Sequence, residues 1–357
     1  MNNKIIILLL AGIAALPAVK AQDPVFSQPY LSPIYLNPAA TGAGDYDLRI
    51  SAMYRRQWWS IPSAITYTAL SVDKYIPSKK TALGLLATHS SEGYLKRTGV
   101  YGSLAYTICS KVDASENIDE STWFVSGGIQ VGIAQTRVDY SKLVFDDQID
   151  AGGVIPGSVT SADKVVNNDR WYGDIGAGFL YSQYLNDYNR VLIGVSAHHM
   201  NRPDESLIQT ANSYRSEIPV RWTVNALFTR LIPKSDWSWS FGGIFYKQQA
   251  HNAVQIGAEV MQHKYDMGLG IWYRGSVNFK DTDAFTVTFS INLFGGKGDG
   301  NHKVKAGVAH DAPVGNNRYS YTTGSSELGL VWDIKTYEQA AGLCKPKINC
   351  KCDCPAD

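Results

Sequence analysis

The chain has 357 residues, of which 45% are hydrophobic and 18% are charged, and its formal net charge is +1. Nucleic-acid binding requires a basic patch or stripe, so this near-neutral balance argues against nucleic acid as a partner. One type of segment recurs along the chain and no linker divides it, which indicates one domain rather than several.

The first predicted element is an export signal at residues 1–21. A positively charged start at residues 1–4, an apolar run at residues 5–16 and the small-residue site Val19-Lys20-Ala21 follow the pattern of a cleaved signal peptide. The mature chain is therefore expected to begin at Gln22. No later window is apolar for 18 residues, so the exported chain should be either a soluble secreted protein or an outer-membrane barrel.

Residues 22–45 are rich in proline and aromatic side chains. Four prolines exclude a regular ladder strand, yet the density of apolar residues is too high for a solvated tail. We expect the segment to fold as a plug into the mouth of the barrel that follows, with a gate or a docking strip for a partner as the alternative. The residues assigned to this plug or partner segment are Phe26, Ser27, Gln28, Tyr35, Asn37 and Pro38.

Residues 46–335 contain fourteen stretches in which apolar side chains alternate with small or polar ones, the period of a β-strand. In residues 284–294, for example, Phe285, Val287 and Phe289 share one face, and threonines and a serine share the other. The predicted strands are residues 48–57, 65–75, 81–90, 98–110 and 123–135, five that begin near residues 171, 190, 219, 237 and 252, and residues 266–274, 284–294, 303–311 and 327–334.

The faces opposite the apolar ones carry Arg, Glu, Gln and Gly, which indicates lipid outside and a polar lumen inside. The predicted fold is therefore all-β, a closed 14-stranded antiparallel transmembrane β-barrel of the porin type. Outer-membrane barrels also place aromatic rings at both membrane interfaces, and this chain has 21 Tyr and nine Trp. A soluble double-sheet sandwich is the structural alternative.

The lengths of the gaps between predicted strands follow the same topology. The long gaps, residues 136–170 and 201–218, come after odd-numbered strands, and the tight gaps at 186–189 and 263–265 come after even-numbered ones. Outer-membrane barrels have long outer loops, short periplasmic turns and both termini in the periplasm. Residues 111–122 and 295–302 are expected to be longer inner turns.

The predicted lumenal face carries charges of both signs, which should form a pairing network because an unpaired charge there is costly. Strand parity directs His198 into the lumen and His199 to the outer rim, so the two should not serve one site. No Gly-x-Ser-x-Gly elbow is present, and no enzyme activity or cofactor is predicted. The lumenal charges are Arg49, Arg55, Arg221, Glu259 and Arg274, together with Asp174 and Lys305.

Residues 336–357 form a cysteine-rich tail that is expected to lie in the periplasm. Exported cysteines this close together favour two disulfides, whereas a Cys-x-Cys-x-Cys run could also hold zinc as thiolates, and a tether to another protein is a third option. Disulfides are favoured because no histidine joins the cluster and the spacing is not that of a zinc ribbon. The cysteines are Cys344, Cys350, Cys352 and Cys354.

Several motifs recur in an ordered set along the chain. The opening carries Phe26-Ser27-Gln28, Tyr-Leu-Asn-Pro-Ala at residues 35–39 and Tyr-Arg-Arg-Gln-Trp at residues 54–58, and later motifs lie at residues 143–150, 193–199 and 325–330. Together they resemble the PorP/SprF family of Bacteroidota outer-membrane proteins. The resemblance covers about residues 23–334. It implies a barrel akin to the fatty-acid transporter FadL that serves type IX secretion and gliding without catalysis.

The expected function is therefore that of a non-catalytic outer-membrane component of type IX secretion or the gliding machinery, supporting secretion or surface anchoring of a specific client protein. The implied partners are other type IX secretion components, the secreted client and the lipid bilayer. The alternative is a FadL-like transporter of small hydrophobic molecules, which would need an apolar lumenal pocket and a lateral opening.

Overall fold

The computed structural model describes residues 23–44, 46–62, 65–109, 123–139, 143–150, 153–155, 168–207, 215–276, 282–294, 302–314 and 319–335. The predicted signal peptide at residues 1–21 lies outside the described residues. The predicted tail lies outside them as well, with Cys344, Cys350, Cys352 and Cys354.

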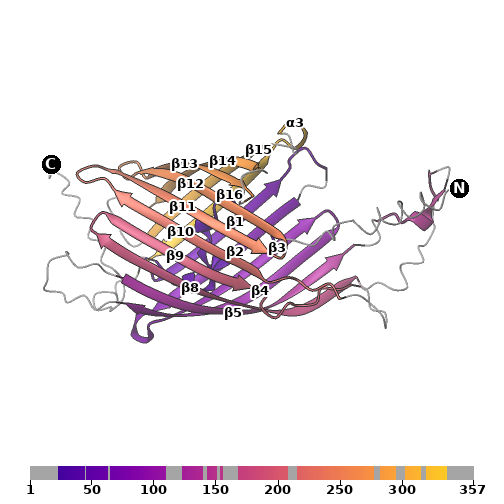
Figure 1. Ribbon diagram of the computed structural model, residues 1–357, viewed down its shortest axis with the longest axis horizontal. Coiled ribbons are helices and arrows are strands. Elements are labelled where there is room, and N and C mark those ends of the chain that lie inside the picture. The colour runs from indigo at the N-terminus through magenta and orange to yellow at the C-terminus, as the bar shows by residue number, and fades with distance from the viewer. Residues whose placement is uncertain are drawn as a thin grey trace, which may run out of the picture.

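Within the described residues, fourteen antiparallel strands close into a single barrel (Figure 1). Each strand pairs with its neighbours along the chain, and the ring closes where β1 pairs with β16, with Leu48 opposite Ile334. The predicted barrel is confirmed, and a double-sheet sandwich is excluded. The strands are β1 Leu48–Gln57, β2 Ile65–Ile76, β3 Thr81–Glu92, β4 Leu95–Cys109, β5 Trp123–Val138, β8 Asp169–Asn186, β9 Asn189–His198, β10 Arg221–Leu231, β11 Trp237–Gln248, β12 His251–Gln262, β13 Met267–Gly275, β14 Thr282–Phe294, β15 His302–Pro313 and β16 Ser325–Ile334.

The two faces of the wall differ as the alternation predicts. In β14, Phe285, Val287 and Phe289 are 42–52% exposed on the outer face, while Thr286 and Thr288 are buried on the inner face. Exposed aliphatic and aromatic side chains on every strand fit a wall that faces lipid. None of the helices in the described part of the chain has the length and hydropathy that a membrane span requires.

The barrel has two unlike ends. The connections after β5 and β9 lie at one end, which we name the long-loop end, and the turn between β8 and β9 lies at the other, the short-turn end. β8 pairs with β9 only from Ala177 onward, so Asp169–Gly176 pairs with β5 alone and reaches past β9. The wall formed by β3, β4, β5 and β8 is therefore taller than the wall formed by β9 and β10 (Figure 1).

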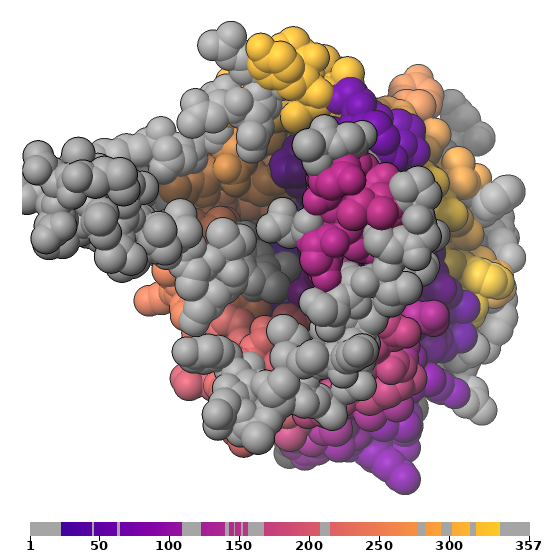
Figure 2. Space-filling model, turned by 90° about the vertical axis from the view of Figure 1, so that its right-hand side faces the viewer, coloured from indigo at the N-terminus to yellow at the C-terminus, as the bar shows by residue number. Residues whose placement is uncertain are grey.

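Small elements complete the fold. A hairpin of β6 Ile149–Asp150 and β7 Gly153–Val154, preceded by η5 Asp146–Gln148, stands beyond the ends of β5 and β8 (Figure 1). Figure 2, which looks at the long-loop end, shows this hairpin in magenta towards the viewer. Among the described residues, the other short helices outside the N-terminal segment are η3 Pro77–Lys79 and α3 Tyr319–Thr322.

Residues 23–44, 46 and 47, named here the N-terminal segment, run through the lumen. The segment forms η1 Pro29–Leu31, α2 Pro33–Leu36 and η2 Pro38–Ala40, each beginning with a proline, whose missing N–H costs nothing in a first turn. At the long-loop end the Asp23 amide donates to Gln248, the last residue of β11. Near the short-turn end the Gly42 amide donates to Asp73 of β2.

This path changes one topological expectation. Both ends of the chain were expected on the short-turn side, and Lys335, which follows β16, does lie there. Asp23 instead lies at the opposite end, beside His199, which follows β9, the first residue of β10 and the last residue of β11. The reason is that the segment crosses the lumen before the first strand begins.

Phe289 and Ser290 are neighbours in β14 that face opposite sides of the wall. Phe289→Lys places a charge in lipid and is expected to lower the free energy of unfolding by about 2 to 4 kcal/mol. Ser290→Lys directs the charge into the lumen, where the Ser290 hydroxyl lies 3.3 Å from Glu259 Oε1, and is expected to cost far less. Urea titrations of both variants refolded into lipid vesicles measure the difference, and equal losses would contradict the assigned faces.

Candidate functional site

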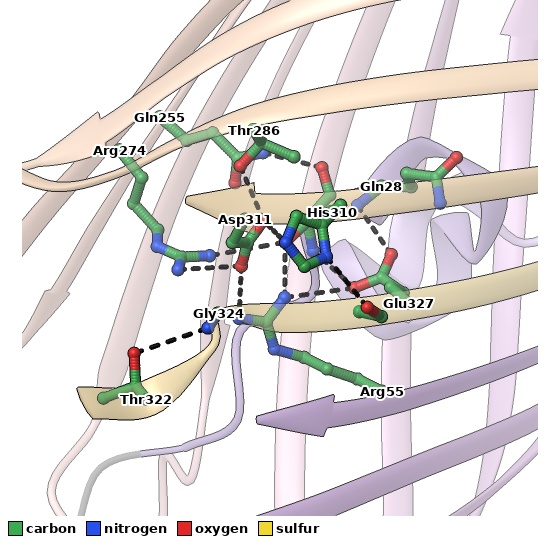
Figure 3. Close-up of polar contacts among 12 residues, drawn as sticks. Gln28, Arg55, Gln255, Arg274, Thr286, His310, Asp311, Thr322, Gly324 and Glu327 are labelled. Carbon is green, nitrogen blue, oxygen red and sulfur yellow. Dashed lines mark hydrogen bonds and ion pairs between the residues drawn. The ribbon is translucent and has the colours of Figure 1, made fainter. Parts of the chain in front are cut away.

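The first part of the N-terminal segment is held by carboxylates of the barrel wall (Figure 3). The two oxygens of Glu327 accept hydrogen bonds from the amides of Ser27 and Gln28 at 2.6 and 2.7 Å. The Ser27 hydroxyl donates to Asp311 at 2.7 Å, and the Gln255 side chain donates to the Ser27 carbonyl at 2.8 Å. Charged acceptors make stronger hydrogen bonds than neutral ones, so these contacts fix the segment firmly.

Two arginines balance the two carboxylates. Arg55, only 2% exposed, pairs with Asp311 at 2.5 Å and with Glu327 at 3.6 Å, and it also donates to the Ser27 hydroxyl. Arg274 pairs with Asp311 at 3.0 Å. A buried ion is tolerated only when it is paired and hydrogen-bonded, and this cluster of two cations and two anions meets that condition.

The middle of the segment docks on glycines of the wall. The Asn37 side chain donates to the carbonyls of Phe179 and Val195 and accepts from the Ala39 amide, which caps η2. A Cβ on Gly128 of β5 would lie 2.5 Å from the Pro38 carbonyl oxygen and from the Ala39 nitrogen. Glycine is therefore required there for the two backbones to approach.

The start of the segment lies in a second charged cluster. Asp23 pairs with Arg221 at 3.0 Å and with His199 Nε2 at 2.9 Å. His199 Nδ1 lies 2.8 Å from Asp174 Oδ2, at an angle unsuited to a hydrogen bond. His199 follows the last residue of β9, and although burial lowers its pKa, the carboxylates outweigh burial and raise the pKa to about 10. The imidazole is thus charged at neutral pH.

The prediction that His199 points to the outer rim is wrong. His199 leaves the strand with a φ of 57°, which breaks the alternation and turns its ring inward beside His198. His198 lies in the lumen as predicted, with its Nε2 3.4 Å from the Leu36 carbonyl oxygen. The two histidines therefore face the same cavity, each bound to a different part of the N-terminal segment.

The other predicted segment residues also contact this interior. The rings of Phe26 and Tyr35 meet edge to face with centroids 5.0 Å apart, and the Tyr35 hydroxyl donates to the Pro24 carbonyl. Of the predicted lumenal charges, Arg49 pairs with Asp333 at 2.6 Å, and Glu259 lies 3.9 Å from Lys305. These two pairs are partly exposed and lie apart from both clusters.

Sequence reasoning missed Asp311, Glu327 and Asp73, which hold the segment from β15, β16 and β2. The signal was available in two of them, because Asp311 shares the parity of Lys305, and Glu327 lies on the face opposite Leu328 and Leu330. Asp23 and His199 gave no such signal, since neither lies in a strand. Among the described residues, no group of three or more His, Cys, Asp and Glu side chains could hold a metal ion.

Glu327→Gln tests the carboxylate that holds the segment. The variant leaves Arg55 with one buried anion fewer and is expected to lower the free energy of unfolding by about 3 kcal/mol. Glu259→Gln is the control, because that residue is 27% exposed and 3.9 Å from its cation, so about 1 kcal/mol or less is expected. Guanidinium titrations in detergent micelles compare them, and an equal effect would argue against the proposed clamp.

Gly128 and Gly127 are adjacent residues of β5 that face opposite sides of the wall. A Cβ at Gly127 would meet nothing within 4 Å, whereas one at Gly128 would strike the backbone of η2. Gly128→Ala carries an overpacking cost of about 1 to 3 kcal/mol, so the rate at which the segment is labelled is expected to rise about tenfold or more. Gly127→Ala is expected to leave that rate unchanged. Exposure is measured by maleimide labelling of Ser32→Cys, which is buried in the parent protein, with peptide mapping.

The chain matches a protein-family model described as type IX secretion system membrane protein PorP/SprF over residues 18–332. No curated protein matches it. Similar solved structures include the NanC porin (12% identity, 81% of this chain and 100% of that chain, TM-score 0.38), Omp33 of Acinetobacter baumannii (9%, 82% and 98%, 0.37) and a Pseudomonas aeruginosa FadL homologue (10%, 83% and 91%, 0.37). Because the family model covers most of the sequence, the chain belongs to the PorP/SprF family of type IX secretion system outer-membrane proteins.

Proposed function

We propose that this protein is a non-catalytic accessory barrel that holds a specific secreted client at the cell surface, and that its N-terminal segment plugs the lumen. The observation that carries the proposal is the segment itself, which spans the lumen from Gln248 to Asp73. A lumen occupied along its length by the protein's own chain suits a scaffold that binds partners better than an open pore.

The contacts of the segment support a lasting plug. Withdrawing it would strip Glu327 of two amide donors and Asp311 of the Ser27 hydroxyl, leaving buried carboxylates short of hydrogen bonds. It would also leave the carbonyls of Phe179 and Val195 without the Asn37 amide. A gate that opens often would need weaker attachments than these.

The surfaces available to partners lie at the ends of the barrel. In this proposal the long-loop end faces the cell exterior, as in other outer-membrane barrels. There Ile149 and Val154 of the hairpin, and Val144 before η5, are each more than half exposed, and exposed apolar groups in water mark contact sites. The cysteine-rich tail, residues 336–357, is assigned to periplasmic contacts, with disulfides favoured over zinc.

The alternative, FadL-like transport of small hydrophobic molecules, would need an apolar pocket in the lumen. The cavity beside the N-terminal segment is lined by aromatic rings but also by Arg97, Asp174 and Glu205. Buried charges of this kind disfavour an acyl chain as the occupant. The lining therefore favours the client-binding function over transport of hydrophobic molecules.

Deleting the gene is expected to remove one client from the cell surface, or the motility that depends on it, while other secreted proteins still reach the medium. The double variant Ile149→Asn, Val154→Asn should reduce client retention while the barrel assembles normally. Ile232→Asn is the matched control, because Ile232 is an exposed aliphatic residue at the short-turn end. Surface proteomics of the three strains measures retention.

Two results would overturn the proposal. One is a deletion strain that displays and secretes every client normally but loses uptake of a hydrophobic nutrient, which would establish the transport function instead. The other is equal client loss in the hairpin variant and the Ile232→Asn control, which would show that the hairpin does not select the client.

A further inference from the structure

We propose that the cavity between the N-terminal segment and the long-loop end binds a neutral saccharide. This cavity, named here the vestibule, has a volume of about 100 Å³. Phe26 and Tyr35 of the N-terminal segment contribute to its lining, and Tyr101, Gln130 and Asp174 of β4, β5 and β8 contribute from the wall. This ligand site lies inside the barrel and is independent of the proposed client surface.

The charged groups of the vestibule are already paired with one another. Arg97 pairs with Glu205 at 3.0 Å, Arg221 pairs with Asp23 at 3.0 Å, and His199 lies between Asp23 and Asp174. A charged ligand would have to break one of these pairs or be buried without a partner, and both are costly. The ionic balance of the cavity therefore favours a neutral ligand.

Four buried polar atoms of residues that line the vestibule have no hydrogen-bond partner among the described residues. Two of them, His199 Nδ1 and Arg221 Nε, belong to cations already held in ion pairs. The other two are the Gln130 amide nitrogen, a donor, and Asp174 Oδ1, an acceptor. Gln130 and Asp174 are each at least 95% buried. Leaving such atoms unsatisfied costs free energy, so a molecule that both accepts and donates hydrogen bonds is expected between them.

The rest of the lining is aromatic. Tyr35, Tyr67, Tyr101 and Tyr172 join Phe26 around the cavity, and the Tyr101 ring lies against Gly132, where a Cβ would not fit. Aromatic walls with a few fixed polar groups are typical of small-molecule sites, in which the rings take the apolar part of the ligand and the polar groups set its orientation.

The hydroxylated edge of a pyranose ring meets all three conditions, since a cavity of about 100 Å³ holds only part of the sugar. Its hydroxyls both donate and accept, which satisfies Gln130 and Asp174 together, and its C–H faces can lie on tyrosine rings. It carries no charge that would compete with the ion pairs. The same chemistry could come from a free sugar or from the saccharide of a cell-surface glycan, and the experiment has one arm for each source.

The test uses the full chain in lauryldimethylamine oxide, a detergent without a sugar headgroup. The first arm titrates glucose, galactose and mannose by isothermal calorimetry, and the second titrates lipid-free polysaccharide released from the outer leaflet of the producing bacterium by mild acid. Saturable binding in either arm is expected. Gln130→Met should weaken it about 3- to 10-fold, the value of one neutral hydrogen bond, without loss of the fold because the amide has no partner to lose.

Thr288→Val is the matched control. It also removes a buried, unpartnered polar atom of the lumen, but Thr288 does not line the vestibule, so binding should be unchanged. No saturation in either arm up to the solubility limit would overturn the inference. Equal weakening by both variants would also overturn it, as would tighter binding of laurate or of lysine amide than of every saccharide tested.

Discussion

Backbone pairing in lipid is the constraint on which the rest of this structure depends. A wall exposed to hydrocarbon must leave no N–H or C=O group unpaired, and the β1–β16 ladder from Leu48 and Ile334 to Gln57 and Ser325 removes the open edge. A ring of fourteen strands encloses more space than its own side chains fill, since about eight strands suffice for a packed interior. The N-terminal segment occupies that space, so its position is a consequence of barrel size.

Placing a chain inside the lumen creates a second constraint, because its amides lose water. Carboxylate side chains of the wall, rather than a further strand, accept hydrogen bonds from these amides. Glu327 accepts two consecutive amides, Asp73 accepts the Gly42 amide, and Arg55 and Arg274 balance the charge at the first of these sites. Glu327, Asp311 and Asp73 each lose at least one hydrogen bond if the segment leaves, which couples barrel and segment.

Membership of the PorP/SprF family makes this protein an outer-membrane component of type IX secretion, from a family of secretion-system membrane proteins rather than enzymes. Most of the motifs that resemble the family meet inside the barrel, where residues 26–28 contact Arg55 and Glu327, and residues 35–39 contact residues 193–199. Residues 143–150 are different, because they lie beyond the strand ends. The internal motifs thus join the N-terminal segment to the wall, whereas residues 143–150 take no part in those contacts.

The sequence by itself determined the architecture, because side chains that alternate in polarity with a period of two require a wall with one apolar and one polar face. Phe289 lies on the outer, apolar face, and Thr288 lies on the inner, polar face. It also assigned Phe26 and Asn37 to a plug or partner segment and Arg55 to the lumenal face. Only the tertiary structure decided that Asp23 reaches the long-loop end and that His199 turns inward. Periodicity predicts side-chain direction only within a strand. The positions of Asp23 and His199 depend instead on the left-handed backbone of His199 and on a contact between two residues more than 170 positions apart.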